Sequence, residues 1–463
     1  MKIEQIYTKC LAEASYFIES EGECLIIDPL RETKPYIQRA KETNSKIKYI
    51  LETHFHADFV SGHVDLAKKT GAEIVFGPEA KADFKFKTLK DGEILVLGDI
   101  KIKAIHTPGH TLESTCYLLI NEEEEQKALF SGDTLFIGDV GRPDLAVKTE
   151  LSREDLAGLL FDSLHNKILP LNDNLIVYPA HGAGSACGKN MSKETFDSLG
   201  SQKKTNYGLR LDVTKKEFIS ELLEGILPSP QYFPKNAQMN SLKTNKEIDT
   251  IISTGTKALS LKEFDKEVEG GALILDVRSP DEFSDGHIPN SWFIGIDGDF
   301  APWVGNLVED LKQKIVIVCP KKREEEVVKR LARVGYDNSR GYLLGSFEAW
   351  KKSGRKKSKI LNKKAKDIEE LYGDIEIIDV RKPREFNFEH IKGANSFPLD
   401  YLFKKKEENM DKRKTHYIHC AGGYRSVIFI SILKTKGYEK LINIKGGYNA
   451  LKNTSIPKKY NYS

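Results

Sequence analysis

Two histidines and an aspartate alternate with other residues directly after an apolar run. The run covers residues 47–51, and the polar residues that follow it are His54, His56 and Asp58. Imidazoles and a carboxylate this close together are typical ligands of a transition-metal ion. The apolar run reads as a buried strand, so we expect the three side chains to project from its end. A polar loop that contains histidines by chance is the alternative, and three downstream sites argue against it.

Those three sites complete a set of metal ligands. Each follows a strand-like run, and each run would carry its polar residue to the same rim of a β-sandwich. The residues are His110, Asp133 and His181, after the runs at residues 102–105, 128–130 and 175–178. The sequence therefore predicts a metal centre that is assembled from the ends of several strands.

The order and spacing of these motifs resemble the metallo-β-lactamase superfamily. The shared pattern is His-X-His-X-Asp, followed by a histidine, an aspartate and a histidine. The resemblance implies a sandwich of α/β and α+β type with outer helices, the αββα fold, which we expect over residues 1–240. The helical spacing of residues 151–168 fits one of the outer helices.

The residue after the motif aspartate bears on the number of metal ions. Dinuclear members of the superfamily have a histidine there, whereas this chain has Phe59, which cannot bind a metal. A second ion would have only Asp58, His181 and a shared Asp133, a poor ligand set for zinc. We therefore expect one ion per chain. Two imidazoles and one carboxylate with open positions are the ligand set of non-haem Fe(II) oxygenases.

Three segments look like the glyoxalase-II-like persulfide dioxygenases, namely residues 54–63, 138–145 and 179–190. The resemblance implies one Fe(II) ion with three protein ligands, a shell of groups that orient the ligands and bound water, and a basic pocket for an anionic thiol. The implied iron ligands are His54, His110 and Asp133. The implied orienting groups are His56, Asp58 and His181. The implied substrate residues are Arg142 and Lys204.

Cys187 lies shortly after His181. It could react with a persulfide at the mouth of the metal site or pack as an inert thiol. Packing is the interpretation we favour, because buried cysteines are common and mostly inert.

The C-terminal half repeats itself. Residues 272–283 recur as residues 375–386, with the shared pattern Asp-Val-Arg…Glu-Phe followed by His-Ile. A repeat of this size predicts two copies of one α/β fold. The pattern resembles rhodanese domains, which we expect at residues 257–355 and 360–460. The basic stretch between the copies lacks interleaved aromatic residues, so we interpret it as a solvated linker rather than a nucleic-acid site.

A glycine-containing loop follows a strand in the second copy. It reads Cys-Ala-Gly-Gly-Tyr-Arg-Ser from Cys420 onward and precedes an apolar helix. Glycines let backbone N–H groups turn inward and form an anion-binding nest at a helix N-terminus. That field and Arg425 favour the thiolate form of Cys420 and bind an anionic sulfur species beside it. We therefore predict that Cys420 is a nucleophile, with an inert buried cysteine as the alternative.

The first copy differs at the same place. Cys319 is followed by Pro320, which lacks an N–H donor, and by three glutamates at residues 324–326 in place of the glycines. Carboxylates there would raise the thiol pKa and repel anionic substrates. We therefore expect the first copy to be degenerate.

Composition narrows the class of protein. The chain has 463 residues, 30% of them charged and 40% hydrophobic, with a net charge of +3, which predicts a multidomain globular protein rather than a nucleic-acid binder. We expect no signal peptide and no membrane span, because neither pattern occurs. Six scattered cysteines without a Cys-X-X-Cys pair suggest reduced thiols and a cytoplasmic setting.

Taken together, the resemblances imply an iron persulfide dioxygenase fused to a sulfurtransferase. The small-molecule partners would be a thiol persulfide, O₂, sulfite and thiosulfate, with neither nucleic acid nor membrane as a partner. The identity of the thiol, the direction of sulfur transfer and the formation of a homo-oligomer stay open. The alternatives are a zinc thioesterase of the glyoxalase II type that carries rhodanese domains, and a sulfur-relay protein in which Cys420 only stores and passes on sulfur.

Overall fold

The computed structural model describes residues 1–144, 151–226, 228–243, 246–403 and 410–460. The chain divides into two compact units. One comprises Met1–Ile248 with the short segment Ala332–Gly335, and the other comprises Asp249–Leu331 and Tyr336–Ser463.

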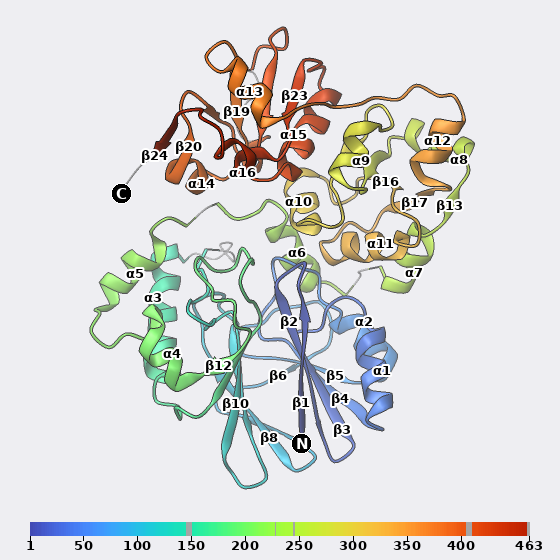
Figure 1. Cartoon of the computed structure of the whole chain (residues 1–463). Helices are drawn as coiled ribbons and strands as arrows, with labels where there is room; N and C mark the ends of the chain where they lie inside the picture. Colours follow the sequence, from blue (N-terminus) through green and yellow to red (C-terminus); the bar gives the residue numbers. More distant parts are fainter. Residues whose placement is uncertain (145–150, 227, 244–245, 404–409, 461–463) are drawn as a thin grey trace. The chain divides into compact units, whose positions relative to one another are not determined.

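Two six-stranded sheets form the first unit (Figure 1). The first sheet contains, in order, β1 (Lys2–Thr8), β2 (Glu13–Ser20), β3 (Glu23–Ile27), β4 (Lys46–Leu51), β5 (Glu73–Phe76) and β6 (Lys87–Thr88). The second contains, in order, β12 (Asp197–Ser198), β11 (Ile176–Pro179), β10 (Gln126–Gly132), β9 (Thr115–Ile120), β8 (Ile100–His106) and β7 (Ile94–Leu97).

Alternation along the strands gives each sheet an inner and an outer face. In β2, Tyr16 and Ile18 join a core that both sheets share, whereas Phe17 joins a cluster with Tyr36 and Leu66 of the outer helices. The helices of this unit are α1 (Lys34–Glu42), α2 (His63–Thr70), α3 (Arg153–Ser163), a π-helix (Leu164–Ile168), α4 (Leu199–Thr205), a 3₁₀-helix (Tyr207–Leu209), α5 (Lys215–Leu223) and α6 (Phe233–Asn240). The expected αββα sandwich is confirmed, as are a strand over residues 47–51 and helical structure within residues 151–168.

The second unit holds two five-stranded parallel sheets with the same strand order. The first is β13 (Ala258–Leu259), β17 (Ser339–Leu343), β16 (Ile315–Val318), β14 (Leu273–Asp276) and β15 (Trp292–Phe293). The second is β18 (Leu361–Lys363), β23 (Leu441–Ile444), β22 (His416–His419), β19 (Glu376–Asp379) and β21 (Asn395–Ser396). A further pair joins β20 (Glu389–Ile391) to β24 (Lys458–Tyr460). The repeated order is what the repeated sequence predicts.

Helices flank both of these sheets (Figure 1). Around the first sheet they are α7 (Ile248–Gly255), α8 (Leu261–Glu269), α9 (Pro280–Asp285), α10 (Phe300–Leu307), α11 (Glu324–Arg333) and α12 (Ser346–Lys352). Around the second they are α13 (Ala365–Leu371), α14 (Pro383–Phe388), a 3₁₀-helix (Leu399–Tyr401), α15 (Tyr424–Thr435) and α16 (Gly447–Leu451). Among the described helices none is long and apolar enough to cross a bilayer. All six cysteines are free thiols.

Candidate functional site

The end of β4 is tied to the end of β3 by Asp28. Its carboxylate accepts a hydrogen bond from the Thr53 backbone N–H at 2.7 Å and another from the Thr53 hydroxyl at 2.8 Å. The hydroxyl donates its only hydrogen to Asp28. It must therefore accept the hydrogen bond from His54 Nδ1, which lies 3.0 Å away. His54 therefore carries its proton on Nδ1 and presents the lone pair of Nε2.

His110 is held in the same tautomer by a different group. Its Nδ1 lies 2.8 Å from the backbone carbonyl of Arg142, which can only accept, so Nδ1 donates and Nε2 is left as the acceptor. The loop that brings this carbonyl close depends on Gly141. A Cβ at that residue would lie 1.9 Å from the backbone oxygen of Asp133 and 3.1 Å from His110 Nδ1.

The two Nε2 atoms face one oxygen of Asp133. Oδ2 lies 3.9 Å from His54 Nε2 and 3.5 Å from His110 Nε2, and it has no hydrogen-bond partner within the described part of the chain. Ligands about 2.1 Å from a metal in a tetrahedral arrangement are about 3.4 Å apart. Two locked imidazoles and an orphaned, buried carboxylate oxygen thus fit a single divalent metal ion.

The other oxygen of Asp133 begins a buried relay. Oδ1 accepts from His181 Nδ1 at 2.7 Å, and His181 Nε2 lies 2.8 Å from Asp58 Oδ2. Burial opposes charging of His181, but the Asp133 and Asp58 carboxylates outweigh it and hold the pKa of the ring well above its ordinary value. His181 and Asp58 therefore orient Asp133 in this arrangement.

His56 does not join the three-ligand group, by which we mean His54, His110 and Asp133. Its Nε2 lies 3.2 Å from Asp28 Oδ1 and 3.4 Å from Glu52 Oε2, and Glu52 is also 3.0 Å from His63 Nδ1. Burial disfavours a charged His56, yet the two carboxylates raise the pKa of its ring well above the usual range. The sequence reasoning did not single out Asp28 or Glu52 for the site, although both stand at strand ends, one of them two residues before His54.

Phe59 is fully buried, with its ring 4.4 Å from that of His56. Nearby, the structure brings together a set that the sequence did not predict. Asp58, His181 and Cys187 have ligand atoms within 4.8 Å of one another, because the loop after β11 returns to the site. The expectation that a second metal would have only Asp58, His181 and a shared Asp133 was therefore incomplete. Burial raises the pKa of the Cys187 thiol well above its usual value, and the charges of Asp58 and Asp133 add to that effect.

The predicted substrate residues lie in different surroundings. Arg142 is buried, and its guanidinium binds Asp144 through two hydrogen bonds of 2.6 and 2.7 Å and the carbonyl of Ala186 at 3.2 Å. Lys204 is exposed in the last turn of α4, whereas the metal-site groups are buried. The structure thus gives Arg142 a clear part in holding the loop beside His110.

Glu13 is a buried acid that sequence reasoning missed. It starts β2, pairs with His181 through an isolated β-bridge, and is 0% exposed. Neither oxygen of its carboxyl has a hydrogen-bond partner in the described residues. Burial raises the pKa of the Glu13 carboxyl well above its ordinary value, although the imidazoles of His181 and His56 oppose the shift. An acidic residue at an inward-facing strand position was the available signal.

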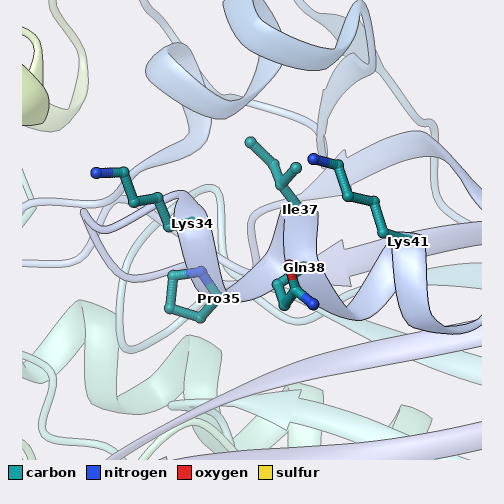
Figure 2. Close-up of a pocket in the computed structure, with 5 residues that line it drawn as sticks. All are labelled: Lys34, Pro35, Ile37, Gln38 and Lys41. Carbon is teal, nitrogen blue, oxygen red and sulfur yellow. The ribbon is translucent and has the colours of Figure 1, made fainter.

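A pocket lies at α1. Figure 2 shows Lys34, Pro35, Ile37, Gln38 and Lys41 around it. It includes none of the predicted site residues, and we assign it no function.

In the second copy of the repeated fold, Cys420 lies between β22 and α15. Its sulfur accepts a hydrogen bond from the Gly423 N–H at 3.0 Å, and the Ser426 hydroxyl lies 3.7 Å away. Gly423 has φ +112° and caps the N-terminus of α15, so glycine is needed for that turn. One backbone N–H, that of Gly423, turns toward the sulfur.

Arg425 is tied to the start of α14. Its guanidinium donates two hydrogen bonds to the Glu385 carboxylate, at 2.6 and 2.8 Å. The bidentate pair fixes the planar group beside the loop of Cys420. Its predicted contact with a sulfur substrate stays a prediction.

Cys319 of the first copy is in a different electrostatic environment. Burial, the nearby carboxylate of Glu324 and then Asp276 raise the pKa of its thiol to about 12. The following helix, α11, opens with three glutamates. A thiol this hard to ionise is a poor nucleophile.

Comparison with known proteins agrees with this architecture. The family model of the metallo-β-lactamase superfamily matches residues 8–181, and that of the rhodanese-like domain matches residues 260–353 and 363–454. Hydroxyacylglutathione hydrolase GloC of Haemophilus influenzae is 32% identical over 219 residues, which are 42% of this chain and 98% of that protein. Hydroxyacylglutathione hydrolase of Dictyostelium discoideum is 27% identical over 51% of this chain and 91% of its own.

Among solved structures, a metallo-β-lactamase from Staphylococcus aureus subsp. aureus COL is similar over 74% of this chain and 98% of its own, with 31% identity and a TM-score of 0.65. The chain belongs to the metallo-β-lactamase superfamily. Its N-terminal domain is of the glyoxalase II type, and two rhodanese-like domains follow it.

Proposed function

We propose that the protein is an iron-dependent persulfide dioxygenase joined to a rhodanese sulfurtransferase. The observation that carries the proposal is the geometry of the three-ligand group. His54 and His110 turn locked Nε2 atoms toward one free oxygen of Asp133, a set with two nitrogens and one carboxylate. That is the donor set that non-haem Fe(II) uses to activate O₂.

The proposed reaction oxidises the terminal sulfur of the persulfide to sulfite. Its balance is R–S–SH + O₂ + H₂O → R–SH + SO₃²⁻ + 2 H⁺. Fe(II), when bound, would supply the activation of O₂. The chain's own contribution is to fix the three donors, to hold Asp133 through His181 and Asp58, and to keep these side chains buried.

The second copy would exchange sulfur between thiosulfate and sulfite, and sulfite is the proposed product of the first domain. In the proposed half-reaction the Cys420 thiolate attacks thiosulfate, so that Cys420–S⁻ + S₂O₃²⁻ gives Cys420–S–S⁻ + SO₃²⁻. The S–S bond of thiosulfate breaks and a new one forms on Cys420, and the reverse step makes thiosulfate from sulfite. The N–H of Gly423, which donates to the Cys420 sulfur at 3.0 Å, would stabilise the anionic sulfur.

A zinc thioesterase is the second candidate. It is favoured by the names of the two hydrolase relatives and by the Asp58, His181 and Cys187 group, which could hold a second ion. A sulfur-relay role without oxidation is the third, and it leaves the complete three-ligand group without a use.

The deciding experiment measures two activities on protein loaded with iron and on protein loaded with zinc. One assay follows oxygen uptake with persulfides of glutathione, coenzyme A and cysteine, and the other follows hydrolysis of a glutathione thioester. The proposal predicts oxygen uptake by the iron form with at least one persulfide. Thioester hydrolysis by the zinc form without oxygen uptake by the iron form would select the thioesterase.

A further inference from the structure

Helix α15, which follows the Cys420 loop, is buried on all sides. Every residue of the run 426–433 is buried. A helix with this pattern packs against partners on more than one side. One side meets β22 and β23 of its own sheet, and another meets β15 and α9 of the first rhodanese-like copy.

Two hydrogen bonds join α15 to the first copy. The Tyr424 hydroxyl donates to the backbone carbonyl of Gly295 at 2.6 Å, and the Phe293 N–H donates to the Ser431 hydroxyl at 2.9 Å. Tyr424 and Ser431 are seven residues apart, so they lie on one face of the helix two turns apart. This face is therefore fixed at both ends.

The ring of Tyr424 sits where two glycines leave room. A Cβ on Gly298 would lie 2.4 Å from Tyr424 Cζ, and a Cβ on Gly295 would lie 3.1 Å from Tyr424 Cε2. Phe293 packs edge-on against the ring, with centroids 5.7 Å apart. Any larger residue at position 298 would displace the tyrosine.

Side chains that follow Cys319 brace the loop that receives Tyr424. Arg330 donates to the carbonyl of Ile296 at 2.7 Å, and Arg323 donates to Asp297 at 2.6 Å. Glu326 pairs with both arginines, at 2.6 and 2.7 Å. In the first copy, charged residues stand where an anion-binding nest would be. These residues hold the loop 295–298, against which Tyr424 packs, in place.

We propose that the first rhodanese-like copy positions the sulfur-transfer loop of the second, with Tyr424 as the positioning residue. Tyr424 directly follows Gly423, whose N–H donates to the Cys420 sulfur at 3.0 Å. Fixing the tyrosine on Gly295 and Gly298 therefore fixes the direction of that N–H. This role rests on the proposed sulfur transfer at Cys420, and it gives the degenerate copy a function.

The test uses the full-length protein and two conservative variants. Tyr424→Phe removes only the hydroxyl, and Gly298→Ala pushes a methyl into the tyrosine ring from the other copy. Tyr424→Phe should slow sulfur transfer from thiosulfate to cyanide by about threefold to tenfold, which corresponds to the loss of one hydrogen bond. Gly298→Ala should also slow the transfer, because the displaced ring takes the hydroxyl away from the Gly295 carbonyl. In a Tyr424→Ala background, Gly298→Ala should cause no further loss, because the clash is gone.

The pH profile of Cys420 alkylation, read on the Cys420 peptide by mass spectrometry, separates positioning from general destabilisation. Tyr424→Phe should move the midpoint to higher pH. Tyr336→Phe removes a buried hydroxyl bond to the carbonyl of Val308 inside the first copy and should leave both the midpoint and the transfer rate unchanged. The proposal would be overturned if Tyr424→Phe and Gly298→Ala both transferred sulfur at the wild-type rate and kept the wild-type pH midpoint of Cys420 alkylation. If wild-type protein transfers no sulfur, the proposed function fails, whereas the alkylation profile still decides the role of Tyr424.

Discussion

The backbone carbonyl of Arg142 lies 2.8 Å from Nδ1 of His110 and thereby selects the nitrogen that His110 turns toward Asp133. The guanidinium of the same arginine binds Asp144 in a buried pair. One residue thus links the tautomer of a predicted ligand to the stability of the loop that carries it.

That relationship predicts what Arg142→Ala does. Removing one partner of a buried pair leaves the Asp144 carboxylate uncompensated, which costs about 3 kcal/mol of unfolding free energy. Metal content should fall as the loop loosens, and Asp144→Asn in the same chain should recover part of the loss. Urea denaturation and metal analysis measure both effects. A variant with normal stability and metal content but a higher KM for persulfide would assign Arg142 to substrate binding, as the resemblance implies.

The metal centre predicts a stoichiometry of about one iron per chain. His54→Ala, His110→Ala and Asp133→Ala should each lose the metal, whereas His165→Ala, a histidine of the π-helix, should keep it. Elemental analysis by mass spectrometry after iron loading gives the count. Two tightly bound ions in wild type and one in Cys187→Ser would show that the Asp58, His181 and Cys187 group is a second metal site.

Cys319 should be unreactive in the folded protein. With a thiol pKa of about 12, its thiolate fraction keeps growing as pH rises through the usual range of cysteine titration. Alkylation of the Cys319 peptide should therefore increase with pH without a plateau below pH 10. Glu324→Gln removes a negative charge, lowers the thiol pKa and should speed alkylation at any one pH. A plateau near pH 8 in wild type would show that the environment of Cys319 is misjudged.

The pair between Arg425 and Glu385 predicts a loss of sulfur transfer when either partner changes. Arg425→Lys cannot form the two parallel hydrogen bonds, so its transfer rate should fall roughly tenfold. Glu385→Gln should lower kcat, because the guanidinium of Arg425 is then no longer held in place. In the double variant, the loss of transition-state stabilisation should be less than the sum of the two single losses. Steady-state assays with thiosulfate provide the rates. Fully additive effects would mean that the two side chains act separately.

Local motifs in the sequence predicted most of the fold and part of the site. Apolar runs followed by single polar residues are direct marks of strand ends, so the αββα sandwich and the positions of His54, His110, Asp133 and His181 could be inferred. The repeat of residues 272–283 in 375–386 likewise predicted two copies of one sheet.

The remaining features depend on contacts between segments far apart in the chain. Cys187 joins Asp58 and His181 only because a loop folds back, and His56 turns toward Asp28 and Glu52 because of the local packing of strand ends. Glu13 belongs to no recognisable motif. It lies near His181 because an isolated β-bridge joins these two residues, which are 168 positions apart in the sequence. The contact of Tyr424 with Gly295 and Gly298 likewise joins distant segments of the chain.

The most direct test compares iron-loaded wild type with Cys420→Ser on one thiol persulfide, with an oxygen electrode and with chromatography of sulfite and thiosulfate. Serine is nearly isosteric with cysteine but cannot carry a persulfide, and Cys420 and the three-ligand group lie in different units of the chain. We predict that the variant consumes O₂ as wild type does, accumulates about one sulfite per O₂, and leaves added thiosulfate untouched, whereas wild type interconverts sulfite and thiosulfate. No O₂ uptake by either protein would contradict the proposed oxidation, and undiminished exchange with thiosulfate by Cys420→Ser would contradict the role of Cys420.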